Sequence, residues 1–193
     1  MFLAGLVDGV RQIIILAGHY DTLFRTGFVG ANDGGSSTGI LLAFADALKD
    51  QSANVQVWLV WTDLEEAVVN FTDTDGLYGS RHLAARLRSE GLVPRIKGFF
   101  LFDMVGDKDL HVTRETQSTR WLQDVIEQAA TQLRYRDYFS QVGIGITDDH
   151  VPFIEGRHSR GGRGRRRVRA DGAALRRHGR VPPCKHGHDG QAL

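Results

Sequence analysis

Histidine and acidic residues recur at four places in the first two thirds of the chain. They are His19 with Asp21, Asp33, the adjacent pair Glu65 and Glu66, and Asp103. Imidazole and carboxylate groups together favour zinc over harder cations, and the single cysteine, Cys184, cannot build a thiolate cluster. A catalytic zinc needs three protein ligands and an open position, and a metal pair needs a carboxylate between the ions. The residue types predict one or two zinc ions, with most of the ligands coming from His19, Asp33, Glu66 and Asp103.

Two further carboxylates stand beside these candidate ligands. Asp21 lies two residues after His19, where it can accept the second imidazole N–H and fix the tautomer of the ring. Glu65 cannot easily share a metal with Glu66, because adjacent side chains diverge from an extended or turning backbone. Glu65 is therefore free to act as a general base on metal-bound water.

Three short apolar runs, rich in β-branched or aromatic residues, predict strands that are buried on both faces. They cover residues 13–17, 55–61 and 98–102. Such continuous runs are typical of the central strands of a parallel sheet.

The segments between and after these strands carry apolar residues at helical spacing. Ser36 or Ser37 can cap a first helix that ends near Leu48. A second helix is expected over residues 79–89, and Ser118 can cap a third. Because strands and helices alternate, the predicted class is α/β, with a doubly wound, mainly parallel sheet and flanking helices.

Each candidate ligand follows a predicted strand or precedes the first helix, and ligands in doubly wound sheets bind beyond the carboxyl ends of the strands. Taken singly, the motifs have plainer explanations. Glu65 and Glu66 would form a solvated turn, Asp33 would be an ordinary turn residue, and Asp103 would cap the next segment. Together on one rim, however, these charges would repel one another strongly without a divalent cation. The joint pattern therefore favours a metal site.

The order of these motifs resembles a known family over roughly residues 8–156. The runs from His19 to Thr22, from Phe28 to Ser37, Glu65-Glu66 and Asp103 to Asp107 look like those of the zinc aminopeptidases of metallopeptidase family twenty-eight. Two more runs, Asp73 to Ala84 and Asp148 to Phe153, look most like the glutaminyl-peptide cyclotransferase branch of that family.

The resemblance implies roles for the candidate residues in an aminopeptidase. Asp33 would be the bridging or sole aspartate ligand, Glu66 a zinc ligand, and His19 and Asp103 ligands of a second zinc. Glu65 would take a proton from zinc-bound water and return it to the departing amine. The leading functional prediction is hydrolysis of N-terminal peptide bonds, with peptide or protein N-termini as the partners.

The cyclotransferase branch implies a second chemistry at the same site. A single zinc is typical there, and Asp103 and Asp149 would form a hydrogen-bonded catalytic network. The α-amine of an N-terminal glutamine would attack its own side-chain amide, and Glu65 would pass the proton to the ammonia that leaves. Formation of N-terminal pyroglutamate is therefore the alternative function.

Three histidines compete as metal ligands but are left out of the predicted set. His82 lies inside the second predicted helix and is expected at the surface or in packing. His111 follows a charged turn and is expected to be solvated. His150 should lie nearest the site, in a segment that the resemblance marks as a loop around the pocket.

The formal net charge of +1 conceals two unlike parts of the chain. Residues 1–156 hold 13 Lys and Arg against 21 Asp and Glu, whereas residues 157–193 hold 11 against 2. We therefore expect a partial zinc-peptidase-like α/β domain over 1–156 and a basic, Arg/Gly-rich tail without strands or helices over 157–193. Such a tail could be disordered and simply solvated, or it could bind nucleic acid without catalysis, which is the less favoured function.

A shift of reading frame gives a third explanation of residues 157–193. Codons allowed by the printed residues can be reread, one base along, as GIPAVDVVDVEYGPT after Gly156 and as YHRANTATTDKL near the end. The second text restores a late histidine that is a zinc ligand in the family. The domain would then be incomplete at its C-terminus, and zinc binding and activity would be impaired in this chain.

Location is not predicted by the sequence. No apolar run approaches the roughly 20 residues of a membrane span. The opening residues lack a basic start and a long apolar stretch, so they do not predict a signal peptide. The first buried strand comes almost at once, which suggests a truncated N-terminus, and family members are often secreted or periplasmic.

Overall fold

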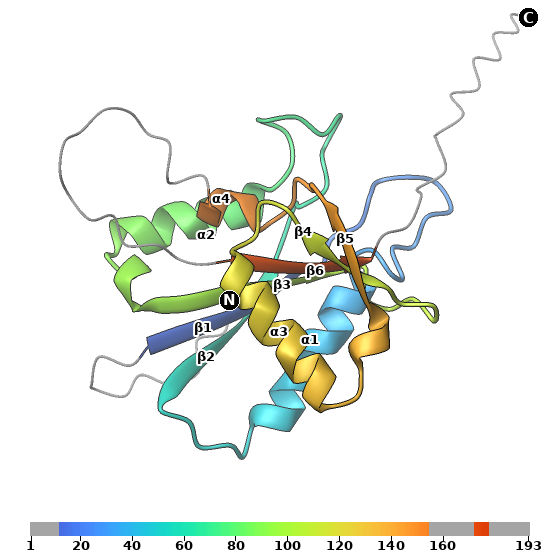
Figure 1. Cartoon of the computed structure of the whole chain (residues 1–193). Helices are drawn as coiled ribbons and strands as arrows, with labels where there is room; N and C mark the ends of the chain where they lie inside the picture. Colours follow the sequence, from blue (N-terminus) through green and yellow to red (C-terminus); the bar gives the residue numbers. More distant parts are fainter. Residues whose placement is uncertain (1–11, 155–171, 178–193) are drawn as a thin grey trace, which may run out of the picture.

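The computed structural model describes residues 12–154 and 172–177, which form one mixed sheet with helices on both faces (Figure 1). Its strands are β1 (Gln12–His19), β2 (Val55–Thr62), β3 (Ile96–Asp103), β4 (Val112–Glu115), β5 (Phe139–Ile144) and β6 (Gly172–Arg177). They lie in the order β2-β1-β3-β6-β4-β5. All neighbours are parallel except β4 and β6, which are antiparallel. The α/β class and the mainly parallel sheet are confirmed.

The helices divide between the two faces of the sheet. They are α1 (Gly35–Leu48), α2 (Tyr78–Ser89), α3 (Arg120–Gln132) and the short α4 (Val151–Ile154). Phe44 of α1 packs against Phe102 of β3, with ring centroids 5.3 Å apart, and Leu122 of α3 approaches Gly98 on the same face. α2 and α4 cover the opposite face. No helix in the described ranges combines the length and apolar character that crossing a membrane requires.

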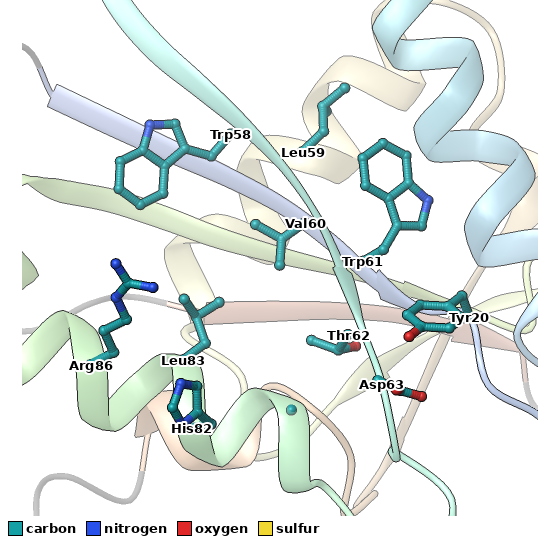
Figure 2. Close-up of a pocket in the computed structure, with 11 residues that line it drawn as sticks. Tyr20, Trp58, Leu59, Val60, Trp61, Thr62, Asp63, His82, Leu83 and Arg86 are labelled. Carbon is teal, nitrogen blue, oxygen red and sulfur yellow. The ribbon is translucent and has the colours of Figure 1, made fainter. Parts of the chain in front are cut away.

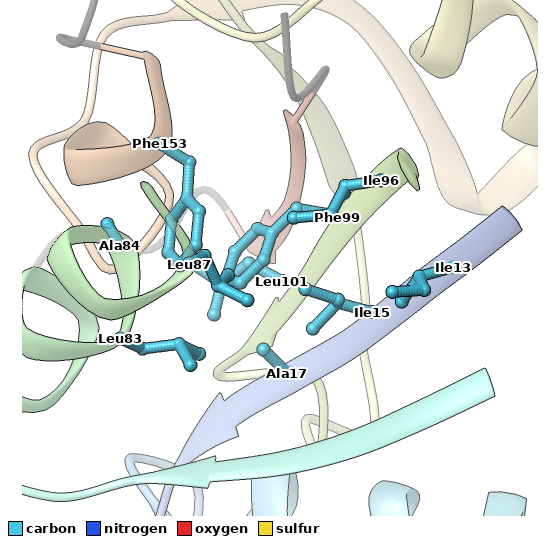
Figure 3. Packing of buried hydrophobic residues seen from close by; sticks show 10 residues of the cluster. All are labelled: Ile13, Ile15, Ala17, Leu83, Ala84, Leu87, Ile96, Phe99, Leu101 and Phe153. Carbon is cyan, nitrogen blue, oxygen red and sulfur yellow. The ribbon is translucent and has the colours of Figure 1, made fainter. Parts of the chain in front are cut away.

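The core beneath α2 explains why the first strand is a continuous apolar run. Ile13, Ile15 and Ala17 point to α2, because alternate residues of a strand share a face (Figure 3). They meet Leu83, Ala84 and Leu87 of α2, together with Ile96, Phe99 and Leu101 of β3. Phe153 of α4 stacks on Phe99, with ring centroids 4.0 Å apart. This packing fixes the strand ends at which the candidate ligands lie.

The predicted strands and helices are present, but two expectations about them are wrong. β2 is a partly exposed edge strand among the described strands instead of a buried central one, and the predicted helix caps do not form. α1 begins after Gly34, and neither Ser36 nor Ser37 caps it. The Ser36 hydroxyl instead donates to the carbonyl of Asn32, and Ser37 is buried against Gly18 of β1. Ser118 also fails as a cap, because α3 begins one residue later, after Thr119, without a side-chain cap. Contacts with other elements outweigh the local capping preference of these serines.

Residues 172–177 correct the prediction that no strand follows residue 156. They form β6, which pairs with Phe99 to Asp103 of β3 and with Val112 and Thr113 of β4. Ala173 to Leu175 is an apolar run of three residues between Gly172 and Arg176, too short for periodicity to reveal. The backbone edge of β3 is what makes a strand of it. The other residues of the predicted tail lie outside the described ranges.

Candidate metal centre and active site

The carboxyl ends of β1 and β3 bring together three of the predicted ligands. His19 ends β1 and is 0% exposed, and its Nε2 lies 3.1 Å from Oδ1 of Asp33 and 3.1 Å from Oδ1 of Asp103. Asp103 ends β3, the direct neighbour of β1. One ligand atom from each of the three residues lies within 4.8 Å of the other two. This group is the candidate metal centre.

The turn before α1 must pass very close to β1 to deliver Asp33. Gly34 has a φ of 84°, and a Cβ on it would lie 2.3 Å from the carbonyl oxygen of Asp21. A side chain there would be strained in conformation and would also collide with backbone. Glycine at position 34 is therefore what allows Asp33 to reach His19.

Three carboxylates surround the buried imidazole of His19, and their negative charges favour a positive charge among them. Burial by itself lowers the pKa of His19, but hydrogen bonds to Asp103, Asp21 and Asp33 outweigh burial and raise this pKa far above its ordinary value. The surrounding carboxylates thus favour a cation at their centre, which a protonated imidazole or a divalent metal can supply. One nitrogen and several carboxylate oxygens form a donor set that suits zinc.

Asp21 connects β1 with the loop that carries the two glutamates. Its Oδ1 lies 3.5 Å from Nδ1 of His19, and its two oxygens accept the amide N–H groups of Glu65 and Glu66, each at 3.1 Å. Burial opposes ionisation of Asp21, yet the hydrogen bonds from His19 and from both amides lower its pKa. The carboxylate therefore orients the imidazole and also fixes the glutamate loop.

Glu65 and Glu66 lie beside the three-residue group but differ in exposure. Glu65 is 8% exposed, and burial, aided by the charges of Asp149 and Asp103, raises its pKa to about 8. Burial, followed by the charge of Asp33, also raises the pKa of the half-buried Glu66. Among the described residues, Glu66 is next to the group of mutually close donor atoms and not within it. Glu65 is well suited to accept and return a proton near neutral pH.

Asp149 reaches this site from a segment that is distant in sequence from the other candidate residues. Its carboxylate is 0% exposed and accepts the hydroxyl of Thr62, the last residue of β2. Burial raises the pKa of Asp149 in spite of hydrogen bonds with Ser80 and Thr62. Its charge in turn raises the pKa of Glu65. A hydrogen bond between Asp103 and Asp149 stays a prediction.

The three competing histidines have different surroundings. His82 is exposed on α2, and His111 is exposed just before β4. His150 is fully buried, and its Nε2 lies 3.2 Å from Oε2 of Glu115. Sequence reasoning did not single out Glu115, because a pair separated by 35 residues has no local signal.

Asp75 is another residue that sequence reasoning missed. Its carboxylate accepts the amide N–H groups of Val68, Val69 and Asn70 at 2.8 to 3.0 Å, and the hydroxyl of Tyr78 at 3.3 Å. These bonds lower the pKa of Asp75 and hold the loop that follows Glu66. Asp75 lies in the run from Asp73 to Ala84, which resembles the cyclotransferase branch, and that resemblance was the feature of the sequence that could have identified it.

A cavity of about 340 Å³ lies next to the site, between β2 and α2 (Figure 2). Its walls are mainly apolar, with Trp58 and Val60 on the strand and Leu83 on the helix. Thr62 lines the cavity and also donates to Asp149, so one wall of the cavity adjoins the candidate site.

Two curated proteins are similar to this chain over most of its length. A glutaminyl-peptide cyclotransferase-like protein of Bos taurus is 31% identical over 180 residues, covering 78% of this chain and 47% of that protein. A glutaminyl-peptide cyclotransferase of Drosophila melanogaster is 26% identical over 179 residues, covering 79% and 51%. The chain spans about half the length of the curated relatives it matches.

A solved structure and a family model extend the comparison. The glutaminyl cyclase of an Acidobacteriales bacterium superposes with a TM-score of 0.74 and is 38% identical, covering 85% of this chain and 54% of that one. The model of peptidase family M28 matches residues 4–162, which include every predicted site residue. The chain therefore belongs to peptidase family M28.

Proposed function

We propose that this site cyclises N-terminal glutamine to pyroglutamate, with zinc as the metal. The glutaminyl cyclase that is 38% identical over most of the chain supports this reaction, as do the curated cyclotransferase relatives. We therefore favour pyroglutamate formation, which was the alternative function predicted from the sequence, over aminopeptidase activity. The substrates are peptides or proteins that begin with glutamine.

His19, Asp33 and Asp103 would hold the metal, with Glu66 as a further ligand beside them. Zinc, when bound, would polarise the side-chain amide carbonyl of the substrate. Asp21 would hold the imidazole of His19 and the loop of Glu65 and Glu66 in place beside the other carboxylates.

Glu65 would move the proton in this reaction. The α-amine of the substrate attacks the carbon of its own side-chain amide, so a ring C–N bond forms and the original amide C–N bond breaks. Glu65 accepts the proton that the amine loses and returns it to the nitrogen that leaves as ammonia. A carboxyl group with a pKa of about 8 can perform both transfers near neutral pH. The buried position of Glu65 beside the metal ligands is the observation that carries this proposal.

The test follows loss of ammonia from a peptide with N-terminal glutamine, using mass spectrometry and a high concentration of zinc-loaded protein. We expect conversion that Glu65→Gln abolishes while the zinc content stays the same. Asp46→Asn, which alters an exposed ion pair on α1, is the matched control and should keep the wild-type rate. Equal conversion by wild type and Glu65→Gln would refute the assignment.

Aminopeptidase activity is the second candidate, because the same carboxylate can take a proton from water and the family model is that of a peptidase. A leucyl anilide distinguishes the two reactions, since it has an N-terminal peptide-like bond but no side-chain amide to cyclise. Release of the aniline without pyroglutamate formation from the glutamine peptide would favour the hydrolase.

A further inference from the structure

Glu115 and His150 form a buried polar pair that the proposed chemistry does not use. Glu115 ends β4 and is 2% exposed, while His150 precedes α4 and is 0% exposed. Nε2 of His150 lies 3.2 Å from Oε2 of Glu115. The other carboxylate oxygen, Oε1, accepts the amide N–H groups of Gln117 at 2.9 Å and Ile146 at 3.3 Å.

The backbone of Glu115 is also held firmly. Oε1 of Gln123 on α3 accepts the Glu115 amide at 3.2 Å, and the Nε2 of the same side chain donates to the Glu115 carbonyl at 2.9 Å. The carboxylate therefore projects from a fixed point where β4 and α3 meet. Through Ile146 and His150 it holds both ends of the segment that leads to Asp149.

Asp149 lies between two anchors. On one side its carboxylate accepts the hydroxyl of Thr62 at the end of β2. On the other side its neighbour in sequence, His150, is held by Glu115. Asp149 has no water-exposed surface. Ser80 also hydrogen-bonds its carboxylate, and the carboxylate of Asp148 accepts its amide N–H at 2.6 Å, so these two anchors act together with local contacts.

We propose that Glu115 and His150 are a positioning pair that holds Asp149 against Thr62 and beside Glu65. The pair touches neither substrate nor metal and acts through the segment from Ile146 to Asp149. This role rests on the proposed function for its effect on turnover, but the placement of Asp149 can be measured without turnover.

The chemistry of the pair allows a sharp test with Glu115→Gln. An ionised carboxylate only accepts hydrogen bonds, so Nε2 of His150 must carry the proton in the wild type. In the variant, the amide oxygen keeps the two backbone N–H donors and the amide nitrogen faces His150. That nitrogen can only donate, so the ring must move its proton to Nδ1. Glu115→Ala removes the anchor altogether.

Nitrogen NMR of the His150 ring tests the pair directly in metal-free protein. We expect the Nε2–H tautomer in the wild type, the Nδ1–H tautomer in Glu115→Gln and averaged tautomers in Glu115→Ala. Arg114→Gln is the matched control, since the neighbouring Arg114 side chain instead pairs with Asp124 and Glu127 of α3. A His150 ring that responds alike to all three variants would disprove the pair.

The Thr62 hydroxyl proton reports where Asp149 lies. Bonded to a buried carboxylate, this proton should exchange slowly and give a resolved NMR signal. The signal should persist in Glu115→Gln and Arg114→Gln and vanish in Glu115→Ala. Its persistence in a folded Glu115→Ala would overturn the positioning role, whatever the activity of the protein.

The kinetic constants kcat and KM distinguish a positioning role from a purely structural one. We expect Glu115→Ala to lower kcat for the glutamine peptide by roughly 10- to 100-fold with little change in KM. In an Asp149→Asn background the same change should have almost no further effect, because the pair acts through Asp149. Additive losses would contradict the proposal. Absence of turnover both in this chain and in the chain with the alternative frame restored would refute the proposed function alone, since the two NMR measurements still decide the positioning role.

Discussion

Individual residues in the site each serve more than one neighbour. Asp21 contacts the ring of His19 and also both glutamate amides, and Glu115 contacts His150 and two backbone amides. A buried carboxylate with several donors is held in one place, because each lost bond leaves a polar group without a partner. Single substitutions at these positions should therefore change the geometry of groups that they do not replace.

Asp21→Asn should weaken the site more than it weakens the fold. Asparagine has one acceptor oxygen, so it can keep only part of the contact with His19 and the amides of Glu65 and Glu66. We expect zinc affinity or turnover to fall by roughly 10- to 100-fold, as for other partners of metal ligands. Chelator competition measures the affinity, and Asp46→Asn serves as the control. Unchanged affinity and turnover would show that Asp21 does not support the site.

Glu115 should make stability depend on pH in the acid range. Burial alone would raise its pKa, but the bonds with His150 and the Gln117 amide lower it from 4.5 to about 2. A pKa that is lower in the folded state gives stability that is fully present above the unfolded pKa. That stability, on the order of 3 kcal/mol, is lost as the pH falls from about 5 to 2.

Urea unfolding of wild type and Glu115→Gln across this pH range tests the effect. The variant has no carboxyl group to titrate at this position, so its free energy of unfolding should fall less steeply with acid. The difference between the two proteins should narrow steadily from pH 5 downwards. Parallel curves would mean that the pKa of Glu115 is not lowered by folding.

The candidate ligands were predictable because ligands in a doubly wound sheet bind beyond the carboxyl ends of its parallel strands. His19 and Asp103 follow runs that are visibly strands, and the carboxyl ends of parallel neighbours share one rim. Glu115 and His150 were not predictable as a pair. His150 lies in the run from Asp148 to Phe153 that resembles the cyclotransferase branch, but Glu115 lies in no such run. Their contact depends on how α3 fixes β4.

Among the elements, β2 is an apolar strand at one edge of the described sheet, as β5 is at the other edge. It pairs only with β1 among the described strands, and its residues 55–61 are all partly exposed although most are apolar. An apolar edge strand offers free backbone groups for pairing with another chain. The sequence predicted this strand but placed it at the centre of the sheet, because a continuous apolar run is typical of a central strand; among the described strands that placement is wrong.

Leu59→Lys should reduce self-association through β2. A lysine on an edge strand opposes pairing with another strand, because its charge would have to be buried. We expect light scattering to show a smaller associated fraction at a given concentration. Leu42→Lys makes the same change on an exposed part of α1 and should leave association unaltered. Equal effects of the two variants, or none from Leu59→Lys, would exclude the edge as the site of association.

At the scale of the whole molecule, residues 1–156 are acidic and residues 157–193 are basic. The basic part supplies β6, whose sequence is unusual for a central strand. β6 lies between β3 and β4, yet its sequence contributes one leucine and ends in Arg176 and Arg177. Central strands are usually continuous apolar runs like β1. The sequence reread after Gly156, GIPAVDVVDVEYGPT, has more of that character, so we expect it to take the place of β6 beside β3 in a chain that is read in that frame.

Restoring the alternative frame after Gly156 should strengthen zinc binding. The restored chain gains a histidine across the codons of Pro182 and Pro183, which the family resemblance would make a further zinc ligand beside Asp33 and Glu66. We expect it to keep zinc through gel filtration and to turn over faster than the 193-residue chain. Replacing that histidine with alanine should remove both gains while leaving the new strand intact. If the 193-residue chain itself holds stoichiometric zinc with equal turnover, the printed frame supplies a complete site and the frame hypothesis is wrong.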